Sequence, residues 1–192
     1  MKKTTLSGPS LRWDKLRQGS SKWLLVVIFL TKTVYADTWG TEYLKFELPD
    51  VWNCQSEETQ YICFPKEAAK RKDALIVTAV KLQDPKTDTL EKYYDYLKKS
   101  KKVKTPEGDE ITSEVHLISY KTINEVKWVD ALHQSSEVRD YYTRYLATIH
   151  NSVVIVVAYS TSIQKNILYI NDLRKMVDSL KVTAKLPRKT ED

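Results

Sequence analysis

The sequence predicts an α+β fold: one domain whose mainly antiparallel sheet is flanked by two helices, in the order ββββαββββα, after an N-terminal signal peptide. Three observations lead to this prediction. Strand-like segments follow one another across short turns, which favours hairpins. Two other segments carry apolar residues every three or four positions, as amphipathic helices do. A short apolar run behind basic residues opens the chain.

The first 36 residues have the order of a secretory signal. Basic residues precede an eight-residue apolar run, 23–30, and small residues follow at the −3 and −1 positions. That run is too short to span a bilayer, which takes roughly 20 apolar residues. The alternative is a buried strand. We expect residues 1–36 to be removed by cleavage between Ala36 and Asp37, leaving one domain, 37–192, in the periplasm or outside the cell.

The positive charge of the chain belongs to this signal. The whole chain has a formal net charge of +6, from 31 Lys and Arg against 25 Asp and Glu. Residues 1–36 hold seven of the basic residues and one acid, Asp14, so residues 37–192 have 24 of each. A neutral domain loses the main support for a nucleic-acid partner, and we expect none.

The two cysteines, Cys54 and Cys63, are expected to form a structural disulfide. Segments 52–57 and 60–65 read as two strands, and a turn at 58–59 places the two cysteines opposite each other at a non-hydrogen-bonded position. The alternative, a redox-active pair, usually has the spacing C-x-x-C, whereas eight residues intervene here. An oxidising compartment also favours the structural bond.

The elements before the first helix follow from local patterns. Residues 43–48 alternate between apolar and polar side chains, which predicts a half-buried strand ending at Pro49. The cysteine hairpin comes next, then a charged connection over 66–73. Residues 74–80 are continuously apolar apart from one threonine, which predicts a more deeply buried strand.

A helix is expected over 90–99, because its apolar residues fall at i, i+3, i+4 and i+7. Thr89 or Asp88 is positioned to cap it. The charged stretch 98–110 contains a proline and a glycine, and we expect a loop there.

The second half is expected to consist of two strands, a hairpin and a helix. The strands are 111–118, with Ile111, Val115 and Leu117 inward, and 126–133. The hairpin pairs 141–149 with 152–160 around His150-Asn151. Its second arm is continuously β-branched over 153–157, as in a central strand covered on both faces. A capping box at 161–164 is expected to begin the last helix, whose apolar positions are Ile163, Ile167, Ile170, Leu173, Val177 and Leu180.

Two short motifs resemble a known superfamily. Phe46-Glu-Leu-Pro49, followed by Trp52, resembles the opening strand and turn of PsbP-like and DcrB-like proteins, and Val177-Asp-Ser-Leu180 resembles their terminal helix. The resemblance implies an antiparallel sheet between helices, in a small exported or organellar protein that assists larger assemblies. It carries over no catalytic residue. The cysteine hairpin departs from the usual pattern.

No catalytic or cofactor motif stands out. The domain has two glycines, too few for a phosphate-binding loop. His116, His133 and His150 lie 17 residues apart, unlike close-spaced metal ligands, and we expect each at the surface. Asp130 is the one carboxylate in an apolar setting. It could be an acid or base, but the preferred interpretation is a residue at a strand end or one that forms a salt bridge with Arg139 or Arg144. We expect no cofactor and no metal.

A cluster of lysines and a cluster of tyrosines are candidates for binding surfaces. The lysine cluster Lys98, Lys99, Lys101, Lys102 and Lys104 suits either a solvated helix end and loop, or docking to anionic headgroups or an acidic partner. Peripheral membrane contact would follow from the latter. Tyr141, Tyr142 and Tyr145 could form a binding platform, although Tyr141 and Tyr145 share a face with apolar residues and are expected in the core.

Three functions follow from these observations. The leading hypothesis is an exported, non-enzymatic interaction or accessory module of the cell envelope, with a protein partner there. The second is a carrier of a small ligand or lipid, which requires a sizeable apolar cavity between sheet and helix. The third is an enzyme whose residues come from distant positions, which requires Asp130 and the histidines to converge.

Overall fold

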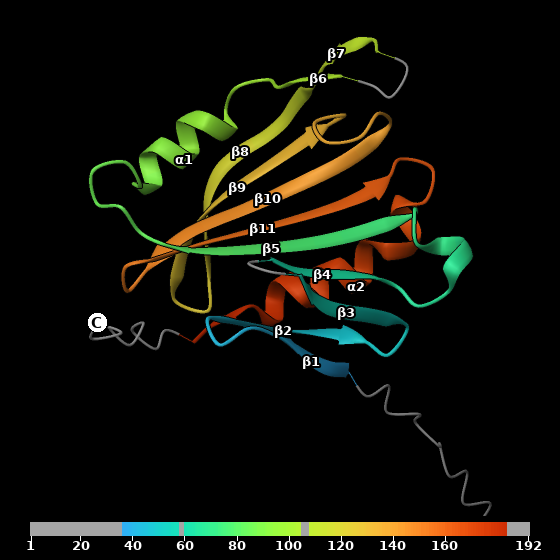
Figure 1. The fold of residues 1–192 in the computed structure, drawn as a ribbon, viewed down its shortest axis with the longest axis horizontal. Helices are drawn as coiled ribbons and strands as arrows, with labels where there is room; N and C mark the ends of the chain where they lie inside the picture. The colour runs from blue at the N-terminus through green and yellow to red at the C-terminus, as the bar shows by residue number, and fades with distance from the viewer. Residues whose placement is uncertain (1–35, 58–59, 105–107, 184–192) are drawn as a thin grey trace, which may run out of the picture. The chain divides into compact units, whose positions relative to one another are not determined.

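The computed structural model describes residues 36–57, 60–104 and 108–183. They form an α+β domain with a mostly antiparallel sheet and two helices, which confirms the predicted fold class (Figure 1). The main sheet has seven strands in the order β3-β4-β5-β11-β10-β9-β8, and every neighbouring pair is antiparallel. Its strands are β3 (Trp52–Glu57), β4 (Gln60–Pro65), β5 (Ala74–Leu82), β8 (Glu114–Ile123), β9 (Val126–Gln134), β10 (Tyr141–His150) and β11 (Val153–Ser162).

The central strand of this sheet is β11, as its β-branched run predicts. Its odd-numbered residues, including Ile155 and Val157, face the larger apolar core. Its even-numbered residues, including Val156, face a second cluster on the other side of the sheet. The odd-numbered face of β11 is therefore fully buried, while its even-numbered face is half-buried from Val156 onward.

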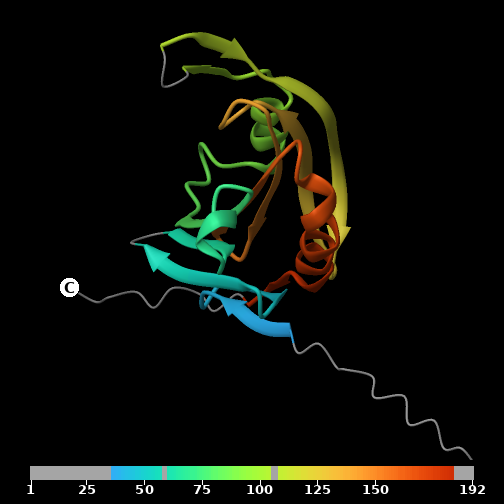
Figure 2. The ribbon, with the colours of Figure 1, turned by 90° about the vertical axis from the view of Figure 1, so that its right-hand side faces the viewer.

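Two helices and a small sheet provide this cover. Helix α1 (Leu90–Leu97) packs on β8, β9 and β10 on one face, and α2 (Asn166–Ser179) packs on the opposite face. The small sheet has the order β1-β2-β12, from β1 (Ala36–Gly40), β2 (Leu44–Pro49) and β12 (Lys181–Val182). It lies beside α2 and away from α1 in both views (Figures 1 and 2).

The larger core lies between α2, β2 and the main sheet. Leu44, Phe46 and Leu48 alternate along β2 and are fully buried, as their pattern predicts. Burying such side chains contributes about 1.5–3 kcal/mol each, so apolar packing on α2 holds β2 in place more strongly than its pairing with the two-residue β12. Trp52 is also fully buried, and its indole N–H donates to Asp172 on α2 at 3.1 Å.

Two-residue turns join the long hairpins. Asn124 and Glu125 connect β8 to β9, and Asn151 and Ser152 connect β10 to β11. All four residues have positive φ, between 46° and 68°. This backbone matches the twist of paired strands, and asparagine adopts it readily at the first position. The predicted tip at His150-Asn151 is therefore displaced by one residue, and His150 pairs with Val153.

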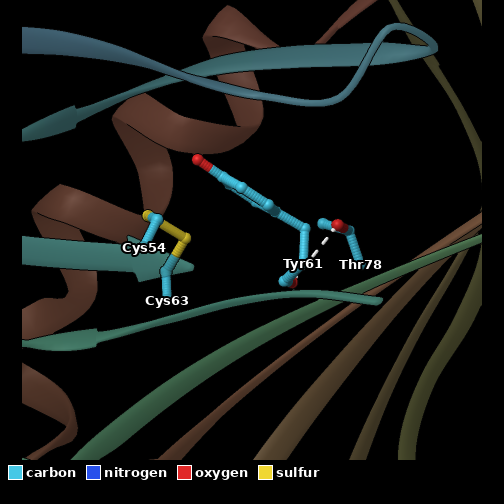
Figure 3. The surroundings of a disulfide bond; sticks show 4 residues. All are labelled: Cys54, Tyr61, Cys63 and Thr78. Carbon is cyan, nitrogen blue, oxygen red and sulfur yellow. Dashed lines mark hydrogen bonds between the residues drawn. A yellow bond between two sulfur atoms is a disulfide. The ribbon is translucent and has the colours of Figure 1, made fainter. Parts of the chain in front are cut away.

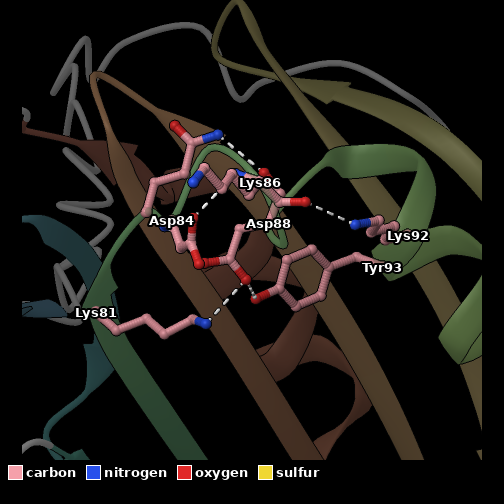
Figure 4. Close-up of polar contacts among 7 residues, drawn as sticks. Lys81, Asp84, Lys86, Asp88, Lys92 and Tyr93 are labelled. Carbon is pink, nitrogen blue, oxygen red and sulfur yellow. Dashed lines mark hydrogen bonds and ion pairs between the residues drawn. The ribbon is translucent and has the colours of Figure 1, made fainter.

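The start of α1 depends on the two residues suggested as caps. The Thr89 hydroxyl accepts the backbone N–H of Lys92 at 3.3 Å and is the N-cap. Asp88 is buried, and its carboxylate accepts from Lys81 Nζ at 2.8 Å, the Asp84 N–H at 2.9 Å and the Tyr93 hydroxyl at 3.1 Å (Figure 4). These bonds hold the pKa of Asp88 below its usual range, with the Lys81 bond the largest cause.

The structure adds short elements to the predicted order. The expected loop over 98–110 is wrong in part, because β6 (Lys102–Lys104) pairs with β7 (Glu110–Thr112). Residues 105–107 lie outside the described part. Strands β1 and β12 and a single 3₁₀ turn, η1 (Ala68–Lys70), were also not expected. Each is two to five residues long, too short for hydrophobic periodicity to reveal.

The strand expected over 111–118 divides between β7 and β8, and its inward pattern is partly wrong. A register shift between Val115 and Leu117 reverses the alternation, so Leu117 is exposed. An extra residue in one strand has this effect because side chains alternate with a period of two.

The predicted beginning of α2 is also wrong. Thr161 and Ser162 continue β11, and α2 begins at Asn166 behind Lys165, which makes no side-chain cap. Strand pairing decides this, because Thr161 lies opposite both Ala74 and Tyr142. The N–H groups of Ser162 and Ile163 donate to the carbonyls of Asp73 and Asp140, each at 3.0 Å, so this stretch is bonded to other segments and does not start the helix.

His133 is buried, contrary to the surface position expected for it. It lies on β9 beneath α1, and its Nε2–H donates to the Leu97 carbonyl at 2.8 Å. Its ring packs edge-on against Tyr145, with centroids 5.3 Å apart. His133 therefore holds the end of α1 on the sheet. His116 and His150 are exposed and half-buried, respectively.

Cys54 and Cys63 form the disulfide of the β3–β4 hairpin, with their Cα atoms 4.1 Å apart. The register of the hairpin is the predicted one, from Cys54 opposite Cys63 to Glu57 opposite Gln60. Figure 3 shows the bond on the side of the hairpin that also carries Tyr61, and both contribute to the larger core. Within the described residues, no helix has the length and apolar character needed to cross a membrane.

Removing the disulfide should weaken the domain without abolishing its fold. The double change Cys54→Ala with Cys63→Ala is expected to lower the free energy of unfolding by about 2–3 kcal/mol, because a loop of roughly ten residues loses its cross-link. Urea denaturation measures this change. The reduced wild-type protein should show a similar loss, since β4 also pairs with β5. An unchanged urea midpoint in both the double variant and the reduced protein would contradict a stabilising role of the disulfide.

The stability of the domain should fall as the pH falls from about 7.5 to 5.5. Burial lowers the pKa of His133 below its ordinary value, because imidazolium loses hydration there, and Lys101 and His116 add to this. The Leu97 carbonyl and Glu137 oppose it. Since the unfolded chain binds the proton more readily, the stabilisation is complete above about pH 6.5 and is lost progressively below it.

The variant His133→Gln keeps an amide donor for the Leu97 carbonyl but cannot titrate. Its melting temperature is expected to change less between pH 7.5 and 5.5 than that of the wild type. His150→Gln, at the end of β10, is the matched control and should keep the wild-type slope. Equal slopes in all three proteins would show that His133 is not responsible.

Candidate functional site

A pocket of about 650 Å³ lies beyond the C-terminal end of α1 and collects most of the lysine cluster. We call it the lysine pocket, and its lining consists of Tyr96, Lys99, Ser100, Lys101, Lys102, Val103, Lys104, Ser136 and Glu137. Four of the five predicted docking lysines therefore converge. Lys98 is exposed at the end of α1 and is not part of the lining.

Lys101 makes the largest number of described contacts among these lysines, through both its backbone and its side chain. Its backbone N–H donates to the Ser113 hydroxyl at 2.7 Å, and its carbonyl accepts the Ser113 N–H at 2.8 Å. Its side chain is only 20% exposed, and the Nζ atom lies 3.4 Å from the Glu137 carboxylate. The same atom lies 4.2 Å from the Tyr145 ring centre and 5.2 Å from that of Tyr96.

A second candidate surface is apolar and lies on α2. Ile167 is 79% exposed, Leu168 62% and Val51 56%. Leu168 and Val51 line one pocket of about 590 Å³, together with Tyr169. We call this set, with the partly exposed Ile170, the α2 surface. Adjacent exposed apolar side chains of this size mark interaction sites more often than isolated ones do.

Charged residues of both signs surround the apolar part of this pocket. They are Asp50, Lys66, Glu67, Lys70 and Asp172. Lys70 and Glu67 form an ion pair at 2.7 Å, and both side chains are more than half exposed. The rim therefore has no large excess of either charge.

Two residues of the α2 surface belong to the apolar pattern that predicts the last helix, but this pattern predicts a core position for them. Ile167 and Ile170 belong to the apolar stripe that was expected to face the core. In the structure Leu173, Val177 and Leu180 are buried as predicted, and Tyr169 and Met176 complete the buried stripe in place of the two isoleucines. The helix is turned so that tyrosine and methionine face the core, and the two isoleucines lie outside it.

Asp130 has a structural role. It is buried on β9, and its carboxylate accepts from Arg144 Nε at 2.6 Å and from the same guanidinium group through Nη2. Arg144 also donates to the Tyr159 hydroxyl at 3.0 Å. The bidentate bond raises the pKa of Arg144 above its ordinary value. This is the predicted salt bridge, with Arg144 rather than Arg139 as its partner, and it occupies both carboxylate oxygens.

The three histidines do not converge with Asp130. His133 lies beneath α1, on the sheet face opposite to Asp130, while His150 lies at the hairpin end of β10. The Nε2 atom of His116 lies 3.1 Å from the amide oxygen of Gln134 and 3.9 Å from a carboxylate oxygen of Glu114. No group of three or more His, Cys, Asp or Glu able to hold a metal ion occurs among residues 36–57, 60–104 and 108–183.

The tyrosines of β10 are mainly structural. Tyr145 is buried, and its hydroxyl donates to Glu137 and lies 2.9 Å from the Ser136 hydroxyl. Burial raises its pKa above the ordinary range. The Tyr141 hydroxyl donates to the Lys72 carbonyl, so this side chain fastens the loop before β5. The expectation that Tyr141 and Tyr145 pack inside is thus met for Tyr145, while Tyr141 is half-buried.

The space between α2 and the main sheet is filled by side chains. Trp52, Trp128, Leu173 and Met176 are all fully buried there. A carrier would need an apolar cavity in this position. The packing therefore counts against the carrier hypothesis.

Solved structures of very low sequence identity resemble this domain to different degrees. Cyanobacterial PsbP from Synechocystis sp. PCC 6803 aligns with a TM-score of 0.53 and 7% identity, over 79% of this chain and 95% of that one. LpqN of Mycobacterium tuberculosis, involved in cell envelope biogenesis, gives 0.48 and 12% over 78% and 91%. The Ran-binding protein Mog1p of Saccharomyces cerevisiae gives 0.47 and 8% over 79% and 97%.

No protein-family model matches the chain, and no curated protein matches its sequence. The likeness is therefore one of architecture. It confirms the predicted resemblance at that level: this chain has the fold of PsbP.

Proposed function

We propose that this protein is an exported, non-enzymatic accessory module of the cell envelope that binds a protein partner through its α2 surface. One observation carries the proposal. Ile167, Leu168 and Val51 expose large apolar side chains, Ile170 is partly exposed beside them, and the other apolar residues of α2 are buried in the core. A monomeric soluble domain gains nothing from such a surface unless something covers it.

The charges around the α2 surface favour a protein as the occupant. An anionic membrane would be matched by a predominantly basic rim. The rim instead has two lysines and three carboxylates. Protein interfaces commonly combine an apolar centre with a rim of mixed polarity.

Export is supported by two independent features. The basic and apolar pattern of residues 1–36 is typical of a secretory signal. The Cys54–Cys63 disulfide is expected to persist in an oxidising compartment and to be rare in the cytosol. The superfamily resemblance of Phe46-Glu-Leu-Pro49 implies the same accessory role.

A non-enzymatic role is supported by how the buried polar groups are used. Asp130 is bonded to Arg144, Asp88 stabilises the start of α1, and His133 holds its end. Each of these candidate acids and bases has a structural partner within 3 Å. None of them lines the lysine pocket or the pocket of the α2 surface, although Asp88 lines a smaller pocket of about 290 Å³ beside Tyr93.

The protein isolated from its source cells should begin at Asp37. Intact mass spectrometry is expected to find residues 37–192 with the disulfide formed. Ala36→Phe should retain the precursor, because the position before the cleavage site takes a small residue, whereas Asp37→Asn should be processed normally. A protein that begins at Met1 with free thiols in intact cells would contradict export.

A photo-crosslinking amino acid at position 168 should trap one partner in intact cells. Position 82 is the matched control, because Leu168 and Leu82 are 62% and 63% exposed and lie in different pockets. The partner should form an adduct at 168 and not at 82. With the purified partner, Leu168→Ser is expected to weaken binding roughly tenfold or more, as at an interface hot spot, and Leu82→Ser should not.

The two failures of this experiment have different meanings. Equal adducts at positions 168 and 82, or equal binding by the two serine variants, would show that another surface binds the partner. No adduct at any exposed position would contradict the interaction module itself.

A further inference from the structure

The lysine pocket holds more positive charge than its neighbouring carboxylates neutralise. Lys101 pairs with Glu137 at 3.4 Å, and Lys102 pairs with Glu110 at 2.8 Å. Lys99 and Lys104 make no ion pair with any residue that the structure describes. Because residues 37–192 are neutral overall, this excess is a local property of the pocket.

Helix chemistry explains only part of the cluster. Lys98 and Lys99 follow α1, where positive charge interacts favourably with the helix dipole. That effect falls off within the last turn, and Lys102 and Lys104 lie on β6. Residues two apart in a strand point to the same side, so pairing of β6 with β7 brings these two side chains to one face of the hairpin.

The pocket is organised before any ligand arrives. Backbone bonds to Ser113 and contacts with Glu137 and two tyrosine rings hold Lys101. The β6–β7 pairing places Lys102 opposite Thr112 and Lys104 opposite Glu110. A charged site that is already ordered loses less entropy on binding, and the pocket has four lysines against one carboxylate in its lining, an excess that attracts anions.

The dimensions and donors of the pocket fit a phosphate group. Lysine ammonium groups bind phosphate oxygens as point charges, and the exposed Ser100 is also in the lining, whereas the Ser136 hydroxyl is bonded to Tyr145. A volume of about 650 Å³ lies within the size range of small-ligand pockets. A nucleic-acid strand would instead require a basic track longer than one pocket.

We propose that the lysine pocket binds a phosphate group, carried either by a small soluble molecule or by a lipid headgroup. Lys99 pairs with no described carboxylate, Lys104 lies opposite Glu110, which is already paired with Lys102, and Lys101 is fixed between Glu137 and the tyrosine rings at the same site. This site is separate from the α2 surface and does not depend on a protein partner.

The test uses the protein as purified after export. Inorganic phosphate and glycerol 1-phosphate are titrated against sodium chloride at matched ionic strength, with binding followed by ¹⁵N NMR shifts. In a second arm, the protein is sedimented with phosphatidylcholine vesicles with and without phosphatidylglycerol. The pocket variant is Lys99→Gln with Lys104→Gln, and the control is Lys175→Gln with Lys181→Gln. All four lysines are exposed, so neither variant should unfold.

Saturable shifts in the pocket with a soluble phosphate, weakened roughly tenfold in the pocket variant and unchanged in the control, would establish a soluble ligand. Sedimentation that requires phosphatidylglycerol and is lost in the pocket variant would establish a headgroup. The proposal is overturned if phosphate acts no differently from chloride and the vesicles do not bind. It is also overturned if the pocket and control variants respond equally.

Discussion

The structure depends on the need to cover both faces of β11. This strand presents β-branched side chains to each side, and leaving them in water would lose about 1.5–3 kcal/mol per buried residue. Strands β10 and β5 satisfy its backbone, but its faces need other elements. Helix α1 packs on the neighbouring strands β8 to β10 and leaves the even-numbered face of β11 half-buried, while α2 and the small sheet cover the other face fully.

This arrangement also explains how the buried polar residues are used. His133 and Asp130 lie on β9 with their side chains on opposite faces, one beneath α1 and the other in the face that α2 covers. Burial there requires partners, because an unpaired polar group in the interior costs about 1–3 kcal/mol. Arg144 is the partner of Asp130, and the Leu97 carbonyl is the partner of His133 Nε2, while His133 Nδ1 has no partner among the described residues. Residues that resemble candidate catalysts in the sequence are thus bonded within the scaffold, and the surfaces at α2 and beyond α1 are left for binding.

Much of the architecture was predictable from local sequence. The cysteine hairpin had the right register because two arms of equal length surround a two-residue turn, and Thr89 was identified as a possible cap. The errors arose where a distant segment decides the outcome. Thr161 continues β11 because β5 and β10 pair with it, and His133 is buried because α1 lies across β9. The lysine cluster was found, but not its pocket, since β6 is only three residues long.

By itself the sequence determined the α+β class, the order of the hairpins and the pairing of Cys54 with Cys63, because these depend on neighbouring residues. It also determined that residues 37–192 carry no net charge, because this depends on composition alone. Tertiary structure alone decided which side of α2 faces the core. Tyr169 and Met176 fit the space beside Trp52 and Trp128, so Ile167 is left outside. A helical periodicity identifies an apolar stripe, but when a helix has two, only the shape of the surface beneath it selects one.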